Sequence, residues 1–303
     1  MTDPNEYTTP FSFTKEIRRD PYPFLSPTKP ELSQEGKVVI ITGAGTGIGA
    51  AAAKVFAKAG AQGIVITGRR LEPLQKTEGE IKAINKDTTV LLVQGDISVE
   101  KDVIDLFAKV QKEFGKPAEV LINNAAVLDD GKSFAEHSVD SWWRTMEINV
   151  KGLVAMLHHY INTQPDPKKP EGTVVSVLSG RVGIVLPQGS PYNVSKWAEQ
   201  RVVEHVQAEY PTLRMFMSMP GIVHSSMAEG FWVPYAKDHA DLTGLQALYL
   251  TTPVADYLKG TMLSVNWDLE VMEAHKGEIV DKKLLAFSWI PSLPAYGGQG
   301  LGA

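Results

Sequence analysis

Three side chains in the second half of the sequence have the types and spacing needed to move a proton. Tyr192 and Lys196 lie four residues apart in a helix-like run, and Ser179 lies thirteen residues before Tyr192, where a strand-like run ends. Residues i and i+4 of a helix share one face, so the phenol and the ammonium can reach the same space. The Ser179 hydroxyl can donate to a substrate carbonyl and stabilise the alkoxide that develops there.

An ammonium beside a phenol makes the phenol more acidic. Tyrosine has an ordinary pKa of about 10, which is too high for proton exchange at neutral pH. A lysine roughly 5 Å away, at an effective dielectric constant of about 20, stabilises the phenolate by about 3 kcal/mol. This energy corresponds to about two pKa units. We therefore expect Tyr192 to act as a general acid and base that Lys196 tunes.

A glycine-rich segment near the N-terminus supplies the context that this pair needs, since tyrosine and lysine at this spacing more often lie on a solvated helix face. Residues 42–49 read Thr-Gly-Ala-Gly-Thr-Gly-Ile-Gly, between the apolar run 38–41 and a helix-like run. Gly43, Gly47 and Gly49 would let the backbone approach a pyrophosphate at a helix N-terminus. The alternative is a simple tight turn. Together with the three side chains, this loop indicates transfer of a hydride and a proton.

Strand-like and helix-like runs alternate through residues 36–285, which we expect to form one domain. This alternation predicts a parallel sheet with right-handed crossovers, which is an α/β fold of the Rossmann-type, doubly wound kind. Residues 278–280 form a run too short to assign. Strands are expected at 38–41, 64–67, 90–94, 120–122, 173–178 and 214–218, and helices at 50–60, 71–85, 99–114, 142–160 and 192–210.

The two ends and one internal segment depart from this rhythm. Residues 1–35 carry five prolines from position 10 onward, which predicts an extended arm that lies on the fold or is partly disordered. Residues 286–303 are expected to be an irregular tail. The segment at about 224–249, rich in aromatic residues, is either a helical hairpin that completes the core or a substrate loop that covers the site.

Composition limits the possible partners and location. The chain of 303 residues has a net charge of −5, which argues against nucleic acid as a partner. It has no cysteine, which excludes disulfides and thiolate chemistry. No apolar run reaches the roughly 20 residues of a membrane helix, so we expect a cytoplasmic protein with no membrane partner. His158 and His159 have no carboxylate at ligand spacing, which argues against a metal site.

Charge at the end of the second predicted strand indicates which dinucleotide is bound. Sites specific for NAD place an acidic residue there, on the ribose 2′-hydroxyl. Here residues 67–70 read Thr-Gly-Arg-Arg, so the acid is missing and two guanidinium groups follow. Arginine suits the 2′-phosphate of NADP. We expect NADP(H) as cofactor, bound through Arg69 and Arg70, with Arg69 the stronger candidate. The alternative for either arginine is a side chain that only covers the protein surface and binds no cofactor.

The motifs together resemble the short-chain dehydrogenase/reductase family over about residues 37–280. The glycine spacing G-x-x-x-G-x-G fits, residues 123–126 match an Asn-Asn-Ala-Gly element except at Ala126, and residues 148–152 fit an Asn-Val-x-Gly element. Ser225 stands where the family usually has threonine. The resemblance implies a catalytic tetrad of Asn149, Ser179, Tyr192 and Lys196, with Asn149 supporting a proton relay and Lys196 also binding the nicotinamide ribose. It implies a cofactor site that comprises Gly43, Thr46, Gly47, Ile48, Gly49, Arg69, Arg70, Asp96, Ile97, Asn123, Ala125, Tyr192, Lys196, Pro220, Gly221, Val223 and Ser225.

The predicted function is the NADPH-dependent reduction of a ketone on a hydrophobic or aromatic small molecule. Arg181, His224 and Trp232 are the candidate substrate residues, each with a structural alternative. The proline-rich arm resembles fungal members of the family, many of which act on secondary metabolites. Alternatives are an alcohol dehydrogenase in the oxidative direction, a non-catalytic NADPH-binding sensor or scaffold, and a cyclase or isomerase. The family also implies a homodimer or homotetramer.

Overall fold

The computed structural model describes residues 3–129, 131–225, 227–228 and 230–286. Its centre is a sheet of seven parallel strands in the order β3-β2-β1-β4-β5-β6-β7. This order confirms the predicted doubly wound α/β fold. The strands are β1 (Val38–Thr42), β2 (Gly63–Gly68), β3 (Thr89–Gln94), β4 (Val120–Asn123), β5 (Thr173–Val177), β6 (Arg214–Met219) and β7 (Met262–Ser264).

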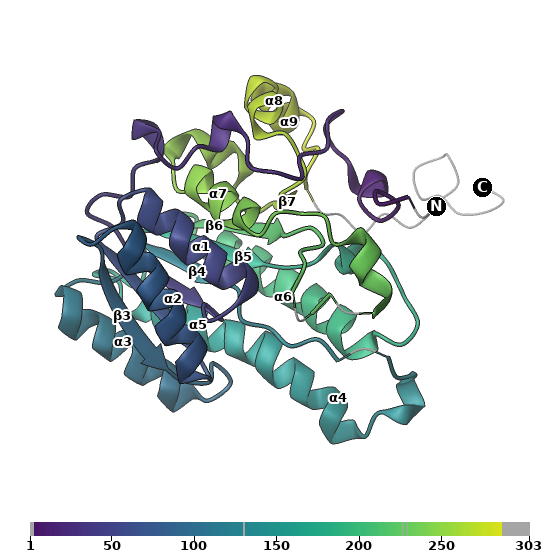
Figure 1. Ribbon diagram of the computed structural model, residues 1–303, viewed down its shortest axis with the longest axis horizontal. Coiled ribbons are helices and arrows are strands. Elements are labelled where there is room, and N and C mark those ends of the chain that lie inside the picture. Colours follow the sequence, from purple (N-terminus) through teal and green to yellow (C-terminus); the bar gives the residue numbers. More distant parts are fainter. Residues whose placement is uncertain (1–2, 130, 226, 229, 287–303) are drawn as a thin grey trace.

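Helices cover both faces of the sheet, which explains the unbroken apolar character of the central strands. In β1, Val39 and Ile41 pack in one core cluster with α1, α2 and α7, whereas Val38 and Ile40 pack in the other with α3, α5 and α6. Figure 1 shows α1 and α2 crossing the strands. The helices are α1 (Gly47–Lys58), α2 (Leu71–Ile84), α3 (Glu100–Phe114), α4 (Val139–Met146), α5 (Gly152–Asn162), α6 (Ser190–Glu209), α7 (Asp241–Leu250), α8 (Leu269–Ala274) and α9 (Lys276–Asp281).

Three parts of the chain differ from the expected elements. The expected helix 142–160 is divided, because the π-helical segment η5 (Glu147–Lys151) separates α4 from α5. Residues 278–280 belong to α9, and the edge strand β7 was not expected at all. A three-residue strand is too short to show a period in the sequence, and β7 owes its position to pairing with β6.

The N-terminal arm lies along the fold from residue 3 onward. It contains three short 3₁₀ turns, η1 (Thr9–Phe11), η2 (Pro23–Leu25) and η3 (Pro30–Leu32), each with proline in its first turn. Leu25 and Leu32 are buried in the same core cluster as α1 and α7. Figure 1 shows the arm in purple, running past α7 and α8.

The segment 224–249 contains a short helix at the surface and a helix in the core. The 3₁₀ helix η7 (Gly230–Tyr235) lies at the surface, and Phe231 is 60% exposed. In α7, every residue from Leu242 to Leu250 is buried, so this helix completes the core. The predicted irregular tail, apart from Ala286, lies outside the described residues. Within the described residues, no helix has the length and apolar character needed to cross a bilayer.

Candidate active site

The glycine-rich segment at the start of α1 is too closely packed for a side chain at Gly43 or Gly49. Gly43 has a φ of +66°, and a Cβ atom there would lie 2.9 Å from the Cα of Ala125. A Cβ on Gly49 would lie 2.5 Å from the carbonyl oxygen of Gly43. Thr42 fastens the neighbouring loop, because its Oγ1 accepts hydrogen bonds from the backbone N–H groups of Asn124 and Ala125, both at 2.9 Å.

A groove of about 1150 Å³ runs from this loop to the ends of β2 and β3. Thr46 is the N-cap of α1 and its side chain makes no capping hydrogen bond, so the helix N-terminus keeps N–H groups for an anion. The glycine-rich loop and the free N–H groups at the start of α1 fit a dinucleotide pyrophosphate. The predicted cofactor residues that line the groove are Gly43, Thr46, Gly47, Ile48, Arg69, Arg70, Asp96, Ile97, Ala125 and Ser225.

The end of the groove next to β2 and β3 carries three residues of the predicted cofactor site, Arg69, Arg70 and Asp96. Arg69 and Arg70 are exposed and follow β2, while Asp96 follows β3. Burial alone would raise the pKa of Asp96, but hydrogen bonds from Ser98 and the charges of Arg144 and Arg69 hold this pKa below its usual value. The Arg69 guanidinium and the Asp96 carboxylate therefore lie close together at this end of the groove.

Tyr192, Lys196 and Ser179 meet where the sequence predicts. Tyr192 and Lys196 lie on α6, with Nζ of Lys196 5.8 Å from the centre of the Tyr192 ring. Ser179 follows β5 and lines the same cavity as Tyr192. The Ser179 Oγ accepts a hydrogen bond from the backbone N–H of Arg181 at 3.2 Å. Its own hydroxyl hydrogen is thus left to donate to another group.

Glu199 is a neighbour of Lys196 that the sequence analysis missed. The Nζ of Lys196 donates to the Val177 carbonyl at 3.0 Å and lies 3.0 Å from each carboxylate oxygen of Glu199. Burial raises the pKa of Glu199 to about 7, against the opposing charge of Lys196. Burial would lower the pKa of Lys196, but Glu199 and Tyr192 outweigh it and raise this pKa. The lysine therefore has a buried counterion, which the i, i+3 spacing of the two residues could have indicated.

Asn149 braces the helix that carries Tyr192. It lies in η5, and its amide donates to the Val127 carbonyl at 3.0 Å and to Ser195 Oγ at 2.9 Å. Its Oδ1 accepts from the Val127 N–H at 2.8 Å. Ser195 in turn donates to the Tyr192 carbonyl at 2.8 Å. The side chain of Asn149 thus joins the loop after β4 to the first turn of α6.

A second cavity, of about 1070 Å³ including its open mouth, adjoins the groove and shares Ile48, Ser225 and Met227 with it. Tyr192 and Ser179 face it together with apolar side chains. Of the predicted residues, Arg181, Trp232, Pro220, Gly221 and Val223 also line it.

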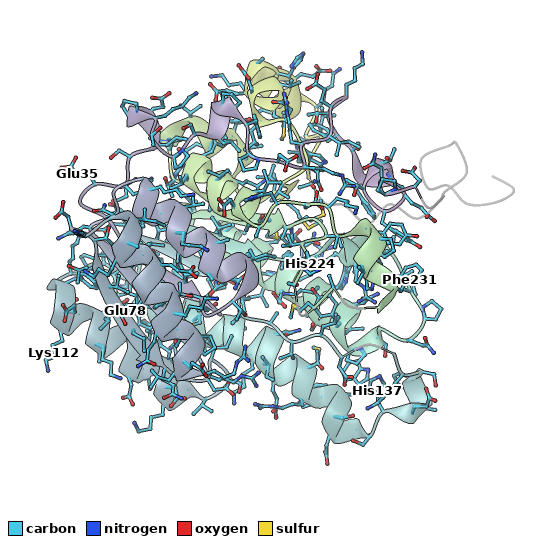
Figure 2. The ribbon with its side chains drawn as sticks, in the orientation of Figure 1. Glu35, Glu78, Lys112, His137, His224 and Phe231 are labelled. Carbon is cyan, nitrogen blue, oxygen red and sulfur yellow. The ribbon has the colours of Figure 1, made fainter. Side chains whose placement is uncertain are left out.

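The remaining predicted residues lie outside the two cavities. His224, labelled in Figure 2, is exposed and lines neither cavity. Lys196, Asn149, Asn123 and Gly49 are buried behind the cavity walls. The Asn123 amide makes no hydrogen bond within the described residues.

The sequence analysis also missed three lining residues that come from the arm, Tyr7, Thr8 and Phe11. They lie more than 160 residues from Ser179 in the chain. No local pattern links them to the site, because only the folded chain brings them there.

Comparisons with known proteins agree with this geometry. A family profile described as short chain dehydrogenase matches residues 37–233. The short chain dehydrogenases citE and pigC of Monascus ruber are 29% and 28% identical, over 278 and 293 residues; the alignments cover 89% and 92% of this chain and 94% of each relative. A solved short-chain type dehydrogenase/reductase from Mycobacterium marinum has a TM-score of 0.71 at 22% identity, covering 78% of this chain and 96% of its own.

Fold and site thus define an oxidoreductase of the Rossmann type, acting on CH–OH or C=O groups with a nicotinamide cofactor. The chain belongs to the short chain dehydrogenase family.

Proposed function

We propose that the protein reduces a ketone on a hydrophobic or aromatic small molecule to a secondary alcohol, with NADPH as the cofactor. The observation that carries this proposal is the position of Tyr192 and Ser179 on one cavity that adjoins the nucleotide groove. When bound, the reduced nicotinamide supplies a hydride to the carbonyl carbon.

The chain's own residues would complete the reduction. The Ser179 Oγ accepts from the Arg181 N–H and donates to no group of the described residues, so its hydroxyl hydrogen can bond the carbonyl oxygen. This hydrogen bond stabilises the negative charge that develops on that oxygen. Tyr192 donates its phenolic proton to the same oxygen, and Lys196 stabilises the phenolate that remains. One hydride and one proton convert the ketone to the alcohol.

The choice of NADPH is supported by charge. Arg69 and Arg70 directly follow β2, which ends at Gly68, and both line the groove. No acidic side chain directly follows this strand. Guanidinium groups bind phosphate through charge-assisted hydrogen bonds. A substrate from fungal secondary metabolism is part of the same proposal, supported by the Monascus relatives.

Assembly into a homodimer or homotetramer is supported by exposed apolar side chains on α4, α5 and α6. Trp143 is 56% exposed, Val194 44% and Val154 42%. Light scattering on the purified chain tests this part of the proposal, and a monomer at micromolar concentration would contradict it.

The catalytic proposal is tested by NADPH consumption over a panel of aliphatic and aromatic ketones, with Tyr192→Phe as the control. We expect turnover that Tyr192→Phe abolishes while the variant still binds NADPH. Tight NADPH binding without turnover of any ketone or of the matching alcohols would instead identify a sensor. Product formation without NADPH would identify a cyclase or isomerase.

A further inference from the structure

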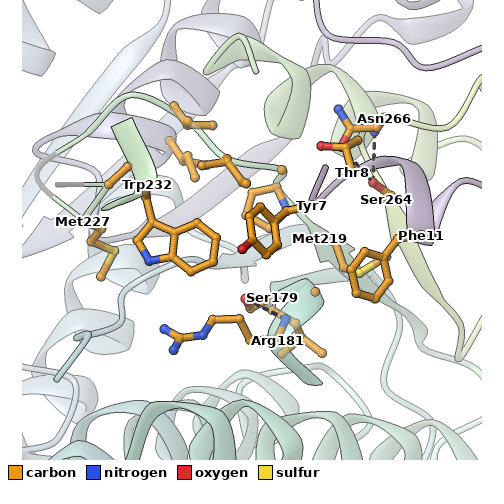
Figure 3. A pocket seen from close by; sticks show the side chains of 18 of the residues that line it. Tyr7, Thr8, Phe11, Ser179, Arg181, Met219, Met227, Trp232, Ser264 and Asn266 are labelled. Atoms are coloured by element: carbon orange, nitrogen blue, oxygen red, sulfur yellow. Dashed lines mark hydrogen bonds between the residues drawn. The ribbon is translucent and has the colours of Figure 1, made fainter. Parts of the chain in front are cut away.

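The N-terminal arm reaches into the cavity that holds Tyr192 and Ser179. Tyr7, Thr8 and Phe11 line this cavity, although the family match begins only at residue 37. Figure 3 shows the Tyr7 ring between Trp232 and Met219, with Ser179 and Arg181 below it in this view. The arm therefore adds a wall that lies outside the segment matched by the family profile.

Aromatic contacts hold Tyr7 against η7. Its ring centre lies 5.2 Å from that of Trp232 and 4.7 Å from that of Tyr235, and both pairs are edge-to-face, with interplanar angles of 68° and 86°. Edge-to-face contact is the arrangement that aromatic rings prefer. The Tyr235 hydroxyl also donates to Glu6 at 3.1 Å, so the arm and η7 hold each other.

Arg19 fixes the start of the arm to the loop that follows β6. Its guanidinium donates to Asn5 Oδ1 and Thr8 Oγ1, each at 2.8 Å from Nη2, and to Asp238 Oδ1 at 3.1 Å. The other oxygen of Asp238 accepts from the Ile222 N–H at 2.6 Å. One buried carboxylate thus ties the arm to the loop that follows β6.

The two ends of the cavity differ in chemistry. Ser179 and Tyr192 supply the hydroxyl groups for a carbonyl, whereas the arm and η7 supply the rings of Tyr7 and Trp232. Phe11 is held beside them, because its carbonyl accepts from the Trp267 indole N–H at 2.7 Å. A ligand with a carbonyl at one end and a flat ring at the other satisfies both ends.

We propose that the arm is part of the substrate site, and that Tyr7 and Trp232 form a subsite for a flat aromatic ring of the ketone. The proposal rests on the proposed reduction of a ketone and names the substrate class of that site. It makes Tyr7 a residue that determines specificity, and not a part of the proton transfer.

The test compares two ketones with the same bicyclic skeleton, the aromatic 2-tetralone and the saturated 2-decalone. Their affinity for the NADP⁺-bound protein is measured by isothermal titration calorimetry, which does not depend on turnover. Tyr7→Leu is expected to weaken 2-tetralone binding by about fivefold, the loss of one aromatic pair, and to change 2-decalone binding by less than about twofold. Tyr7→Phe keeps the ring and is expected to retain the native affinity for both.

The matched control is Phe13→Leu. Phe13 is on the same arm and packs its ring 5.2 Å from that of Trp267, but it does not line the cavity. We expect it to leave both affinities within about twofold. Equal losses for the two ketones in Tyr7→Leu, no loss for either, the same selective loss in Phe13→Leu, or a native protein that binds neither ketone would each overturn the proposal.

The proposed reduction fails separately. If the native protein binds 2-tetralone with the expected dependence on Tyr7 but oxidises no NADPH with any ketone, the subsite stands and the reductase does not. If NADPH is oxidised and Tyr7→Leu leaves the preference for 2-tetralone unchanged, the reductase stands and the subsite does not.

Discussion

Replacing Glu199 by glutamine tests the electrostatics of the buried pair behind Tyr192. Glu199 and Lys196 have side chains that are 4% and 3% exposed, and Nζ lies 3.0 Å from the carboxylate. Glutamine keeps the shape of the side chain and removes the group that titrates. Because burial raises the pKa of Glu199 to about 7, the folded protein holds a proton at a pH where the unfolded chain has lost it.

The sign and size of the effect follow from this difference. Below the unfolded pKa, which is about 4.5, the carboxyl is protonated in both states and its contribution to stability is fully present. As the pH rises to about 7, unfolding releases this proton, and stability falls by about 1.4 kcal/mol per pH unit. The total loss is about 3 kcal/mol, and glutamine does not undergo it. We therefore expect Glu199→Gln to be more stable than the native protein by up to about 3 kcal/mol at pH 8, and by less than about 1 kcal/mol at pH 5.

Urea unfolding without cofactor at pH 5 and pH 8 measures this difference. Glu278→Gln is the control, because Glu278 is exposed and paired at 2.7 Å with Lys282, which lowers its pKa instead of raising it. An exposed pair contributes little, so this variant should follow the native protein at both pH values. A Glu199→Gln variant less stable than the native protein by about 3–5 kcal/mol at pH 8, the cost of breaking a buried ion pair, would refute the reasoning. It would mean that the carboxylate is ionised well below neutral pH and that the pair stabilises the fold.

Three further substitutions examine the two cavities. Tyr192→Phe removes the proton donor and should lower turnover of the preferred ketone by at least about 100-fold. NADPH binding, measured by fluorescence, is the control and should not change. Unchanged turnover would exclude Tyr192 as the acid. Arg69→Ala should lower the ratio of kcat/KM with NADPH to kcat/KM with NADH by at least about tenfold, which corresponds to the loss of one charge-assisted hydrogen bond. An unchanged ratio would contradict binding of the 2′-phosphate by Arg69. Gly49→Ala places a Cβ 2.5 Å from the Gly43 carbonyl oxygen, which must displace the glycine-rich loop. The affinity for NADPH, measured by equilibrium titration, should therefore fall by at least about tenfold. An unchanged affinity would show that the loop can move without loss of binding.

Local patterns predicted the sheet because its central strands are buried on both faces. The run Val38–Ile41 shows this, since alternate residues enter opposite core clusters and all four must be apolar. The alternation of strands and helices then left only the parallel arrangement. The same reasoning placed Tyr192 and Lys196 together, since i, i+4 spacing is set by the helix itself.

What the sequence did not predict depends on contacts between distant segments. The π-helical η5 is accompanied by two hydrogen bonds between the Asn149 side chain and the Val127 backbone, and no composition signal marks it. The burial of Glu199 reflects the packing of α6 on the sheet. The arm owes its course to pairs such as Arg18 with Asp268, which are 250 residues apart in the chain. A single sequence carries no periodicity over such a distance.

The arm's anchors also set the order in which the molecule can be completed during its synthesis. Residues 5–19 leave the ribosome before the groups that receive them, because Asp238, Asn266 and Trp267 are made more than 200 residues later. At about 5–20 residues per second, the nascent arm waits for at least roughly ten seconds before it can dock. The part of the cavity wall that the arm supplies is therefore completed only after strands β1 to β6 have been synthesised.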